Sequence, residues 1–251
     1  MSIGINLNPD ARCNFDCLYC CADRSTPRPH VPIELAVLDA ELRQLVAEWP
    51  RLFEEPEFRT VPLEFRRLND IAFSGDGEPT MVPAFPEAVR IAVAVRADHA
   101  LTDAKIIIIT NACYLARAGV VEALELLDRH NGEIWAKLDA GTDEYHRLVN
   151  RGNVPLPRIL EGLLATARRR PIVIQSLFMR VDGQPPPAAE IDAYVERLRW
   201  LTSEGARISL VQVYSVARRT ADPRVAPLPE AELEAIAAQV RPLGLRVAVF
   251  A

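Results

Sequence analysis

Apolar residues along this chain follow two periods in alternation, one typical of strands and one typical of helices. Near the N-terminus Ile3, Ile5 and Leu7 alternate with small or polar residues, which is the period of a β-strand. Further apolar runs predict strands at 70–74, 105–110, 134–139, 172–178, 208–214 and 245–250. Consecutive isoleucines in the run at 105–110 indicate a strand that is buried on both faces.

Helical stretches separate these strands. Leu35, Leu38, Leu42, Leu45 and Trp49 share one face of a predicted helix. Other helices are predicted at 83–98, 115–130, 156–169, 188–203 and 229–240. Strand and helix in regular succession predict parallel strands joined by crossover helices. The expected α/β fold is therefore a partial (βα)6 TIM-like barrel with an extra C-terminal strand at 245–250, although a flatter sheet shares this periodicity.

Two segments interrupt this rhythm without marking a domain boundary. Residues 50–69 carry charges and prolines and are expected to form a surface excursion, and the prolines at 185–187 suit the start of a helix. Single α/β barrels commonly have ~200–250 residues. We therefore expect one core domain over 1–251.

Composition and charge narrow the class of protein. The chain is 49% hydrophobic and 25% charged, which is ordinary for a globular protein and excludes intrinsic disorder. Its net charge of −5 disfavours nucleic acid as a partner, because nucleic-acid binding usually needs a strongly basic face. Neither a run of ~18 apolar residues nor a signal peptide is visible, so a cytoplasmic protein without membrane association is expected.

The cysteines are few, odd in number and clustered. Cys13, Cys17, Cys20 and Cys21 lie close together, and Cys113 is the fifth. An odd, clustered set without a signal peptide is a poor disulfide framework and favours metal ligation.

The spacing CxxxCxxC points to one kind of metal group in particular. Three thiolates from Cys13, Cys17 and Cys20 can hold three irons of a cubane cluster and leave the fourth iron open for a small ligand. Zinc is the competing interpretation, but structural zinc usually takes four ligands from two separated pairs, and His30 is the nearby candidate for a fourth. Cys21 is interpreted as a small loop residue.

Several motifs together resemble the radical S-adenosylmethionine (radical SAM) superfamily. CxxxCxxC with Tyr19 before the last cysteine resembles its signature, and residues 74–80 (SGDGEPT) resemble its glycine-glycine-glutamate motif, with Asp76 in place of the first glycine. Weaker similarities occur at 110–111, 137–140 and 211–214. Within the superfamily, the chain most resembles the iron–sulfur oxidoreductases related to wyosine synthases, but none of the twelve residues before Cys13 is a cysteine. We therefore expect a single-cluster core.

The resemblance implies a fold, cofactors and a reaction. It implies a partial barrel of the radical SAM type, a [4Fe-4S] cluster and S-adenosylmethionine. The reduced cluster would cleave S-adenosylmethionine to methionine and a 5′-deoxyadenosyl radical, which abstracts hydrogen from a substrate that the sequence does not identify. An external electron donor such as flavodoxin or ferredoxin would be needed. The resemblance also assigns the backbone of Gly75, Asp76 and Gly77 to the amino group of the cofactor. Glu78 is expected to orient that loop or to hold charge there, with a solvent-facing loop acid as the alternative. Tyr19 is expected to contact the adenine side, with a plain packing role as the alternative.

Polar residues on later strands are further candidates for the cofactor or substrate. Alternation places Lys137 and Asp139 on the inner face of one strand, either as a structural ion pair or in contact with the cofactor. Gln175 and Gln212 lie on the polar faces of the next two strands. Asn111 is expected either to contact the cofactor or to cap a helix.

Arginines that follow the strands suggest an anionic substrate, because guanidinium groups suit carboxylate or phosphate recognition. Arg180, Arg218 and Arg219 are the main candidates, with Arg147 and Arg151 near the same predicted rim. Solvated loop charges are the alternative. Cys113 is either a hydrogen-atom donor or a small buried residue.

Three functional interpretations remain open from the sequence. The first is a radical SAM enzyme that acts on a small molecule, and the second is a radical SAM modifier of RNA or peptide that works with a partner protein. The third is an iron–sulfur carrier or regulatory protein without catalysis. The motif at 74–80 argues against the third, since a carrier has no need of a loop that binds an amino acid.

Overall fold

The computed structural model describes residues 1–22, 24, 26 and 28–251. Its strands are β1 (Ser2–Ile5), β2 (Asp70–Phe73), β3 (Lys105–Thr110), β4 (Gly132–Lys137), β5 (Ile172–Leu177), β6 (Met179–Val181), β7 (Ile208–Tyr214), β8 (Val225–Pro227) and β9 (Val247–Phe250). Its α-helices are α1 (Leu35–Glu48), α2 (Phe85–Asp98), α3 (Ala118–Leu127), α4 (Asp143–Val149), α5 (Leu156–Arg169), α6 (Ala188–Ser203) and α7 (Glu230–Val240). Short 3-10 helices are η1 (Trp49–Glu54), η2 (Leu63–Phe65), η3 (Pro79–Met81) and η4 (Arg241–Leu243).

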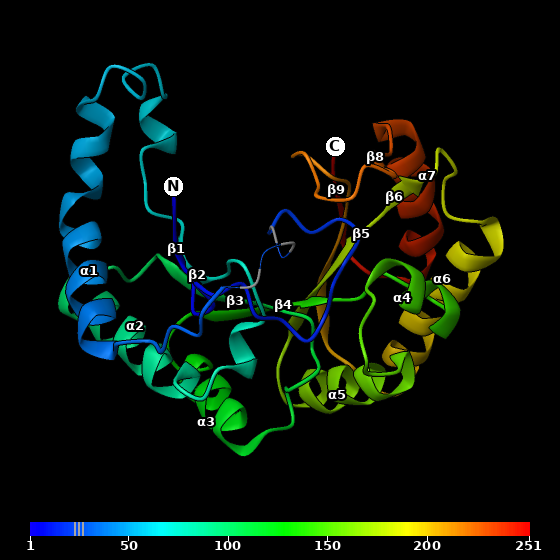
Figure 1. The fold of residues 1–251 in the computed structure, drawn as a ribbon, viewed down its shortest axis with the longest axis horizontal. Helices are drawn as coiled ribbons and strands as arrows, with labels where there is room; N and C mark the ends of the chain where they lie inside the picture. Colours follow the sequence, from blue (N-terminus) through cyan, green and yellow to red (C-terminus); the bar gives the residue numbers. More distant parts are fainter. Residues whose placement is uncertain (23, 25, 27) are drawn as a thin grey trace.

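The main sheet is parallel and curved. Its strand order is β1-β2-β3-β4-β5-β7-β9, and every neighbouring pair is parallel. The helices lie around the outside of the sheet (Figure 1). Strand order therefore confirms the predicted partial barrel, and β9 is the predicted extra C-terminal strand.

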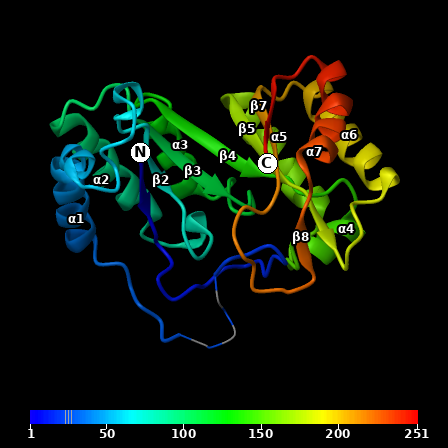
Figure 2. The ribbon, with the colours of Figure 1, turned by 90° about the horizontal axis from the view of Figure 1, so that it is seen from above.

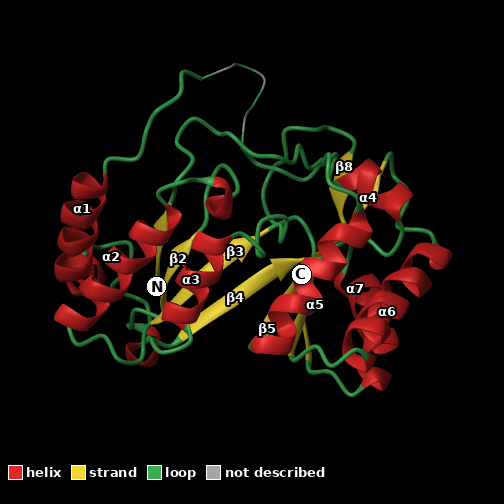
Figure 3. Cartoon of the chain, turned by 90° about the horizontal axis from the view of Figure 1, so that it is seen from below, coloured by secondary structure: helices red, strands yellow, loops and turns green. Residues whose placement is uncertain are grey.

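Apolar side chains on the outer face of the sheet form the core with these helices. Phe73 of β2 and Phe85 of α2 are both fully buried, and their rings meet edge to face with centroids 5.7 Å apart. Ile106, Ile107 and Ile108 are also buried, so β3 is covered on both faces, as the isoleucine run predicts. The strands are thereby held rigidly, and their carboxyl ends point to one side, where the long loops gather (Figure 3).

Some short elements were not predicted from the sequence. α4 is only seven residues long and begins where the side chain of Thr142 accepts a hydrogen bond from Tyr145 N. β6 and β8 pair with each other in a separate antiparallel sheet. Elements this short carry too few residues to show a period. The predicted strand at 134–139 is also displaced, because β4 ends at Lys137 and Asp139 lies beyond it.

The loop that follows β1 crosses to the far side of the barrel. In Figure 2 it runs close to β8, and Ala221 N, in the segment between β7 and β8, donates to Cys20 O at 3.3 Å. The cysteine loop therefore lies between the two ends of the curved sheet. Within the described residues, no helix has both the length and the apolar character needed to cross a bilayer.

Candidate active site

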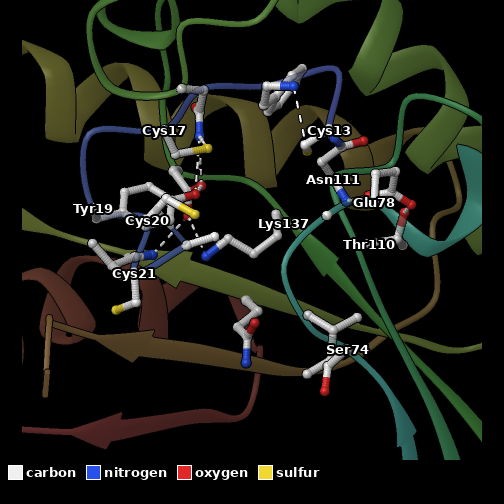
Figure 4. A pocket seen from close by; sticks show the side chains of 18 of the residues that line it. Cys13, Cys17, Tyr19, Cys20, Cys21, Ser74, Glu78, Thr110, Asn111 and Lys137 are labelled. Atoms are coloured by element: carbon white, nitrogen blue, oxygen red, sulfur yellow. Dashed lines mark hydrogen bonds and ion pairs between the residues drawn. The ribbon is translucent and has the colours of Figure 1, made fainter. Parts of the chain in front are cut away.

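A cavity of about 710 Å³ lies at the carboxyl ends of the parallel strands. This volume is within the ~300–1,000 Å³ typical of small-molecule sites. Of the predicted site residues, those that line it are Cys13, Cys17, Tyr19, Cys20, Gly75, Asp76, Gly77, Glu78, Asn111, Lys137, Asp139, Gln175 and Arg218. Gln212 lies behind this lining, where its Oε1 accepts a hydrogen bond from Gln175 Nε2 at 3.0 Å. Figure 4 shows the cysteines, Asn111 and Lys137 projecting into the same space.

Each of the three signature cysteines accepts one N–H hydrogen bond at its sulfur. Phe15 N donates to Cys13 Sγ at 3.4 Å, Asn150 Nδ2 to Cys17 Sγ at 3.6 Å, and Arg24 Nη1 to Cys20 Sγ at 3.0 Å. Burial raises the pKa of the Cys13 thiol and raises that of Cys17 to about 12. The loop therefore presents three sulfurs that are partly sheltered from solvent and already oriented by donors.

The donor set of this loop, three thiols at the spacing CxxxCxxC, suits a cluster in which each thiol takes a different iron. In the described part of the chain, no three His, Cys, Asp or Glu side chains converge closely enough to hold one metal ion. A zinc ion would need its sulfur ligands at ~2.3 Å, whereas a cubane offers a different iron to each cysteine and so needs them farther apart. His30, the candidate fourth zinc ligand, instead has its Nδ1 2.8 Å from Asp10 Oδ2.

The loop after β1 packs so closely on the loop after β2 that it leaves no room for a Cβ at Gly75 or Gly77. A Cβ on Gly75 would lie 2.4 Å from Asn6 Oδ1, and one on Gly77 would lie 2.0 Å from the carbonyl oxygen of Arg12. Asn6 Nδ2 also donates to Asp76 Oδ2 at 3.1 Å. The two loops are thus packed backbone against backbone, and this contact holds the glycine-rich segment beside the cysteines.

Glu78 is buried and its carboxylate ties the loop after β2 to the end of β3. Oε1 accepts from Thr80 N at 3.0 Å, from Thr80 Oγ1 and from Thr110 Oγ1 at 2.7 Å, and Oε2 accepts from Asn111 N at 2.7 Å. Burial raises its pKa, and these donors oppose that rise. Since its acceptors are occupied by the protein, Glu78 positions the loop in this structure.

Replacing Glu78 by glutamine should therefore loosen the cavity wall. An amide nitrogen in place of one oxygen would face N–H or O–H donors and leave at least one buried donor unpaired, at a cost of about 1–3 kcal/mol. Chemical denaturation measures this loss of unfolding free energy. Glu57→Gln is the control, because Glu57 is exposed and its substitution should leave stability unchanged. Equal stability of the two variants would contradict the positioning role.

Lys137 and Asp139 form the predicted ion pair at the cavity. Lys137 Nζ lies 3.1 Å from Asp139 Oδ1, donates to Tyr214 OH, and stands 4.8 Å from the ring centroids of both Tyr19 and Tyr214. Asp139 in turn accepts hydrogen bonds from Tyr19 OH and Leu177 N. Burial opposes the charge on Lys137, but Asp139 outweighs it, so the pKa of Lys137 is held above its usual value.

Comparison of the whole sequence with family models identifies the chain. The model described as the Radical SAM superfamily matches residues 7–184, which include the cysteine loop and strands β2 to β6. The chain belongs to the radical SAM superfamily. No curated protein sequence matches it significantly.

Solved radical SAM structures share its fold at low sequence identity. Streptococcus suis SuiB bound to S-adenosylmethionine is 14% identical with a TM-score of 0.68, and the match covers 100% of this chain and 51% of that one. A radical SAM methyltransferase from Sphaerobacter thermophilus is 16% identical with a TM-score of 0.66, covering 99% and 65% of the two chains. TYW1 with a lysine-pyruvate adduct bound is 16% identical with a TM-score of 0.53, covering 92% and 70%. The chain thus spans about half the length of SuiB.

Two residues beside the radical SAM cysteines carry no sequence signal that we recognised. Arg24 donates to Cys20 Sγ and also to the carbonyl oxygens of Ala11 at 2.9 Å and Asp76 at 2.5 Å. Asn150 reaches Cys17 from the end of α4. Both are distant in sequence from at least one of their partners, so motif spacing could not find them.

Most of the arginines that were expected at the rim of the site form ion pairs with acidic side chains instead. Arg147 pairs with Asp143 on its own helix, Arg151 pairs with Asp16 and Asp222, and Arg180 pairs with Glu232. Of the five arginines, only Arg218 lines the cavity, where it is exposed.

The two remaining cysteines differ in position. Cys21 is exposed and lines the cavity. Cys113 is partly buried, is not part of the cavity lining, and has a pKa raised to about 12 by burial.

Proposed function

We propose that this protein is a radical SAM enzyme in which Cys13, Cys17 and Cys20 hold a [4Fe-4S] cluster and the adjoining cavity binds S-adenosylmethionine. One observation carries the proposal: three thiols, a glycine-rich loop and a buried lysine from distant parts of the sequence line one cavity. When bound, the two groups supply the one-electron reductive cleavage of the carbon–sulfur bond that starts the reaction.

The chain itself holds and shields the reacting groups. Cys13, Cys17 and Cys20 would each hold one iron, which would leave the fourth iron without a protein ligand and available to a small bidentate ligand. Glu78 fixes the glycine-rich loop against the end of β3, while Lys137 and Asp139 keep a balanced pair of charges at the opposite wall. Ile109 and Leu177 add apolar side chains to the cavity lining, which limit the polar surface around the reacting groups.

Anaerobic reconstitution tests the proposal directly. Protein loaded with iron and sulfide should take up one cluster and, with dithionite and S-adenosylmethionine, form methionine and 5′-deoxyadenosine. Cys17→Ala should lose both cluster and product. The enzyme function would be contradicted if wild-type protein bound the cluster but formed no more 5′-deoxyadenosine than Cys17→Ala. That result would favour an iron–sulfur carrier.

We further propose an anionic substrate recognised by Arg218. This arginine lines the cavity, and none of the ion pairs of the described residues involves it, so its guanidinium is available to a carboxylate or phosphate. A small molecule or a peptide with an acidic group satisfies this chemistry. The net charge of −5 gives no support to RNA as the substrate.

Substituting Arg218 should weaken binding of such a substrate selectively. Loss of one charged hydrogen bond removes about 1.5–3 kcal/mol, so Arg218→Ala should raise KM about 10- to 100-fold for any anion that stimulates 5′-deoxyadenosine formation. Arg180→Ala is the matched control, because Arg180 pairs with Glu232 outside the cavity lining. A KM that is equal in both variants would rule out this role for Arg218. Deuterium transfer into 5′-deoxyadenosine identifies which anion donates the hydrogen.

An external one-electron donor such as flavodoxin or ferredoxin completes the proposal. Cys21, next to Cys20, is exposed, which supports access to the cluster loop from the surface. Replacing dithionite by reduced flavodoxin should sustain 5′-deoxyadenosine formation. If neither flavodoxin nor ferredoxin sustains it where dithionite does, this class of partner is wrong.

A further inference from the structure

Asn150 connects a cysteine sulfur to the neighbouring ion pair of Lys137 and Asp139. It is 2% exposed and caps the C-terminal end of α4. Its Nδ2 lies 2.9 Å from Asp139 Oδ2, 3.1 Å from Tyr19 OH and 3.6 Å from Cys17 Sγ. One amide group therefore faces a thiol and a phenol of the cysteine loop and a carboxylate from beyond the end of β4.

His146 sets the direction of this amide. Asp139 Oδ2 is an acceptor, so the amide atom that faces it must be the nitrogen, and Oδ1 of Asn150 then faces the other way. There it lies 2.9 Å from His146 Nδ1, one of two ring nitrogens that face oxygen acceptors, and a neutral imidazole donates from one of the two. The imidazole is itself fixed, since its Nε2 is 3.1 Å from the carbonyl oxygen of Val154 and it is 2% exposed.

Backbone contacts hold the cysteine loop on the same part of the chain. Leu18 N donates to Val149 O at 2.9 Å, and Asp16 N donates to Asn150 O at 3.2 Å. These bonds fall on either side of Cys17. These bonds hold the backbone on both sides of Cys17 against the segment that carries Asn150, and so keep Asn150 Nδ2 near Cys17 Sγ.

We propose that Asn150 is a positioning residue that raises the reduction potential of the bound cluster through its N–H bond to Cys17, with His146 fixing the amide. This inference rests on the proposed function. A reduced cluster carries one more negative charge, part of which lies on its sulfurs, so an N–H donor stabilises the reduced form more than the oxidised form. Asn150 also links the cluster side of the cavity to Asp139 and its partner Lys137.

Potentiometric titration of the reconstituted protein, followed by electron paramagnetic resonance, tests the inference. Asn150→Leu keeps the volume but removes the donor, and Asn150→Ser has a side chain too short to reach the sulfur. Both should retain their iron and show a lower midpoint potential than wild type. His146→Phe should give a smaller decrease, because the amide remains but is no longer oriented.

Tyr194→Phe is the matched control. It removes an equally buried hydrogen bond, between Tyr194 OH and Ser176 Oγ, without touching a sulfur or the cavity, and should leave the potential unchanged. Asn150 variants that keep their iron and titrate at the wild-type potential would overturn the inference. So would folded Asn150 variants that take up no iron, because Asn150 would then be needed for ligation instead of tuning. A wild-type protein without a cluster would refute the proposed function itself, which keeps the two failures distinct.

Discussion

Gly77→Ala should abolish binding of S-adenosylmethionine to the reconstituted protein. The added Cβ would lie 2.0 Å from the carbonyl oxygen of Arg12 and 2.6 Å from Cγ of Asn8. A backbone carbonyl cannot turn aside as a flexible side chain does, so the loop after β1 must move, and that loop carries Cys13. Overpacking of this kind costs about 1–3 kcal/mol or more, and here the cost falls on the contact that shapes the cavity.

Isothermal calorimetry under anaerobic conditions measures the affinity, and a thermal melt measures the stability. The matched control is Gly4→Ala in β1, where the nearest atom to an added Cβ is Ser74 Oγ at 3.9 Å. Alanine fits there and should leave both affinity and stability at or above the wild-type values, because glycine in a strand costs about 0.5–1 kcal/mol of conformational entropy. Wild-type affinity in Gly77→Ala would show that the two loops are not rigidly packed.

Most of the regular fold could be predicted because its strands and helices are long enough to show a period. The isoleucines of β3 and the leucines of α5 are examples, and both elements lie where the pattern places them. α4, β6 and β8 were missed because their positions depend on tertiary contacts more than on local pattern. The omission of α4 matters most for function, since its end carries Asn150.

The candidate site was predictable to the extent that its residues share a short motif. The cysteine spacing and the residues 74–80 each lie within one loop, so sequence distance alone reports their proximity. The roles of single residues were harder to predict. Gly77 lines the cavity, so its assignment to the cofactor's amino group stays a prediction, and the structure adds a second reason for glycine there, because a Cβ would meet the carbonyl oxygen of Arg12. Arg24 reaches the carbonyl oxygen of Asp76 only because the loops after β1 and β2 meet, which no spacing reports.

Lys137→Met should destabilise the protein by about 3–5 kcal/mol, the usual loss when one partner of a buried ion pair is removed. Methionine fills a similar volume but leaves the Asp139 carboxylate, which is 3% exposed, without its cation. Hydrogen bonds from Tyr19, Asn150 and Leu177 would remain, yet none of them carries a compensating charge. Chemical denaturation of the apo protein measures the loss without reference to any bound group.

A double-mutant cycle separates the ion pair from the rest of the network. Asp139→Asn removes the negative charge, and combined with Lys137→Met it should restore part of the lost stability, with a coupling energy of about 0.5–3 kcal/mol. Strictly additive losses would show that Lys137 stabilises the fold through its contacts with the Tyr19 and Tyr214 rings alone. Coupling of the expected size would instead make the pair an electrostatic unit. The pair itself would then add little net charge to the cavity wall, and Lys137 would not be the cation that recognises an anionic substrate, which leaves Arg218 as the proposed one.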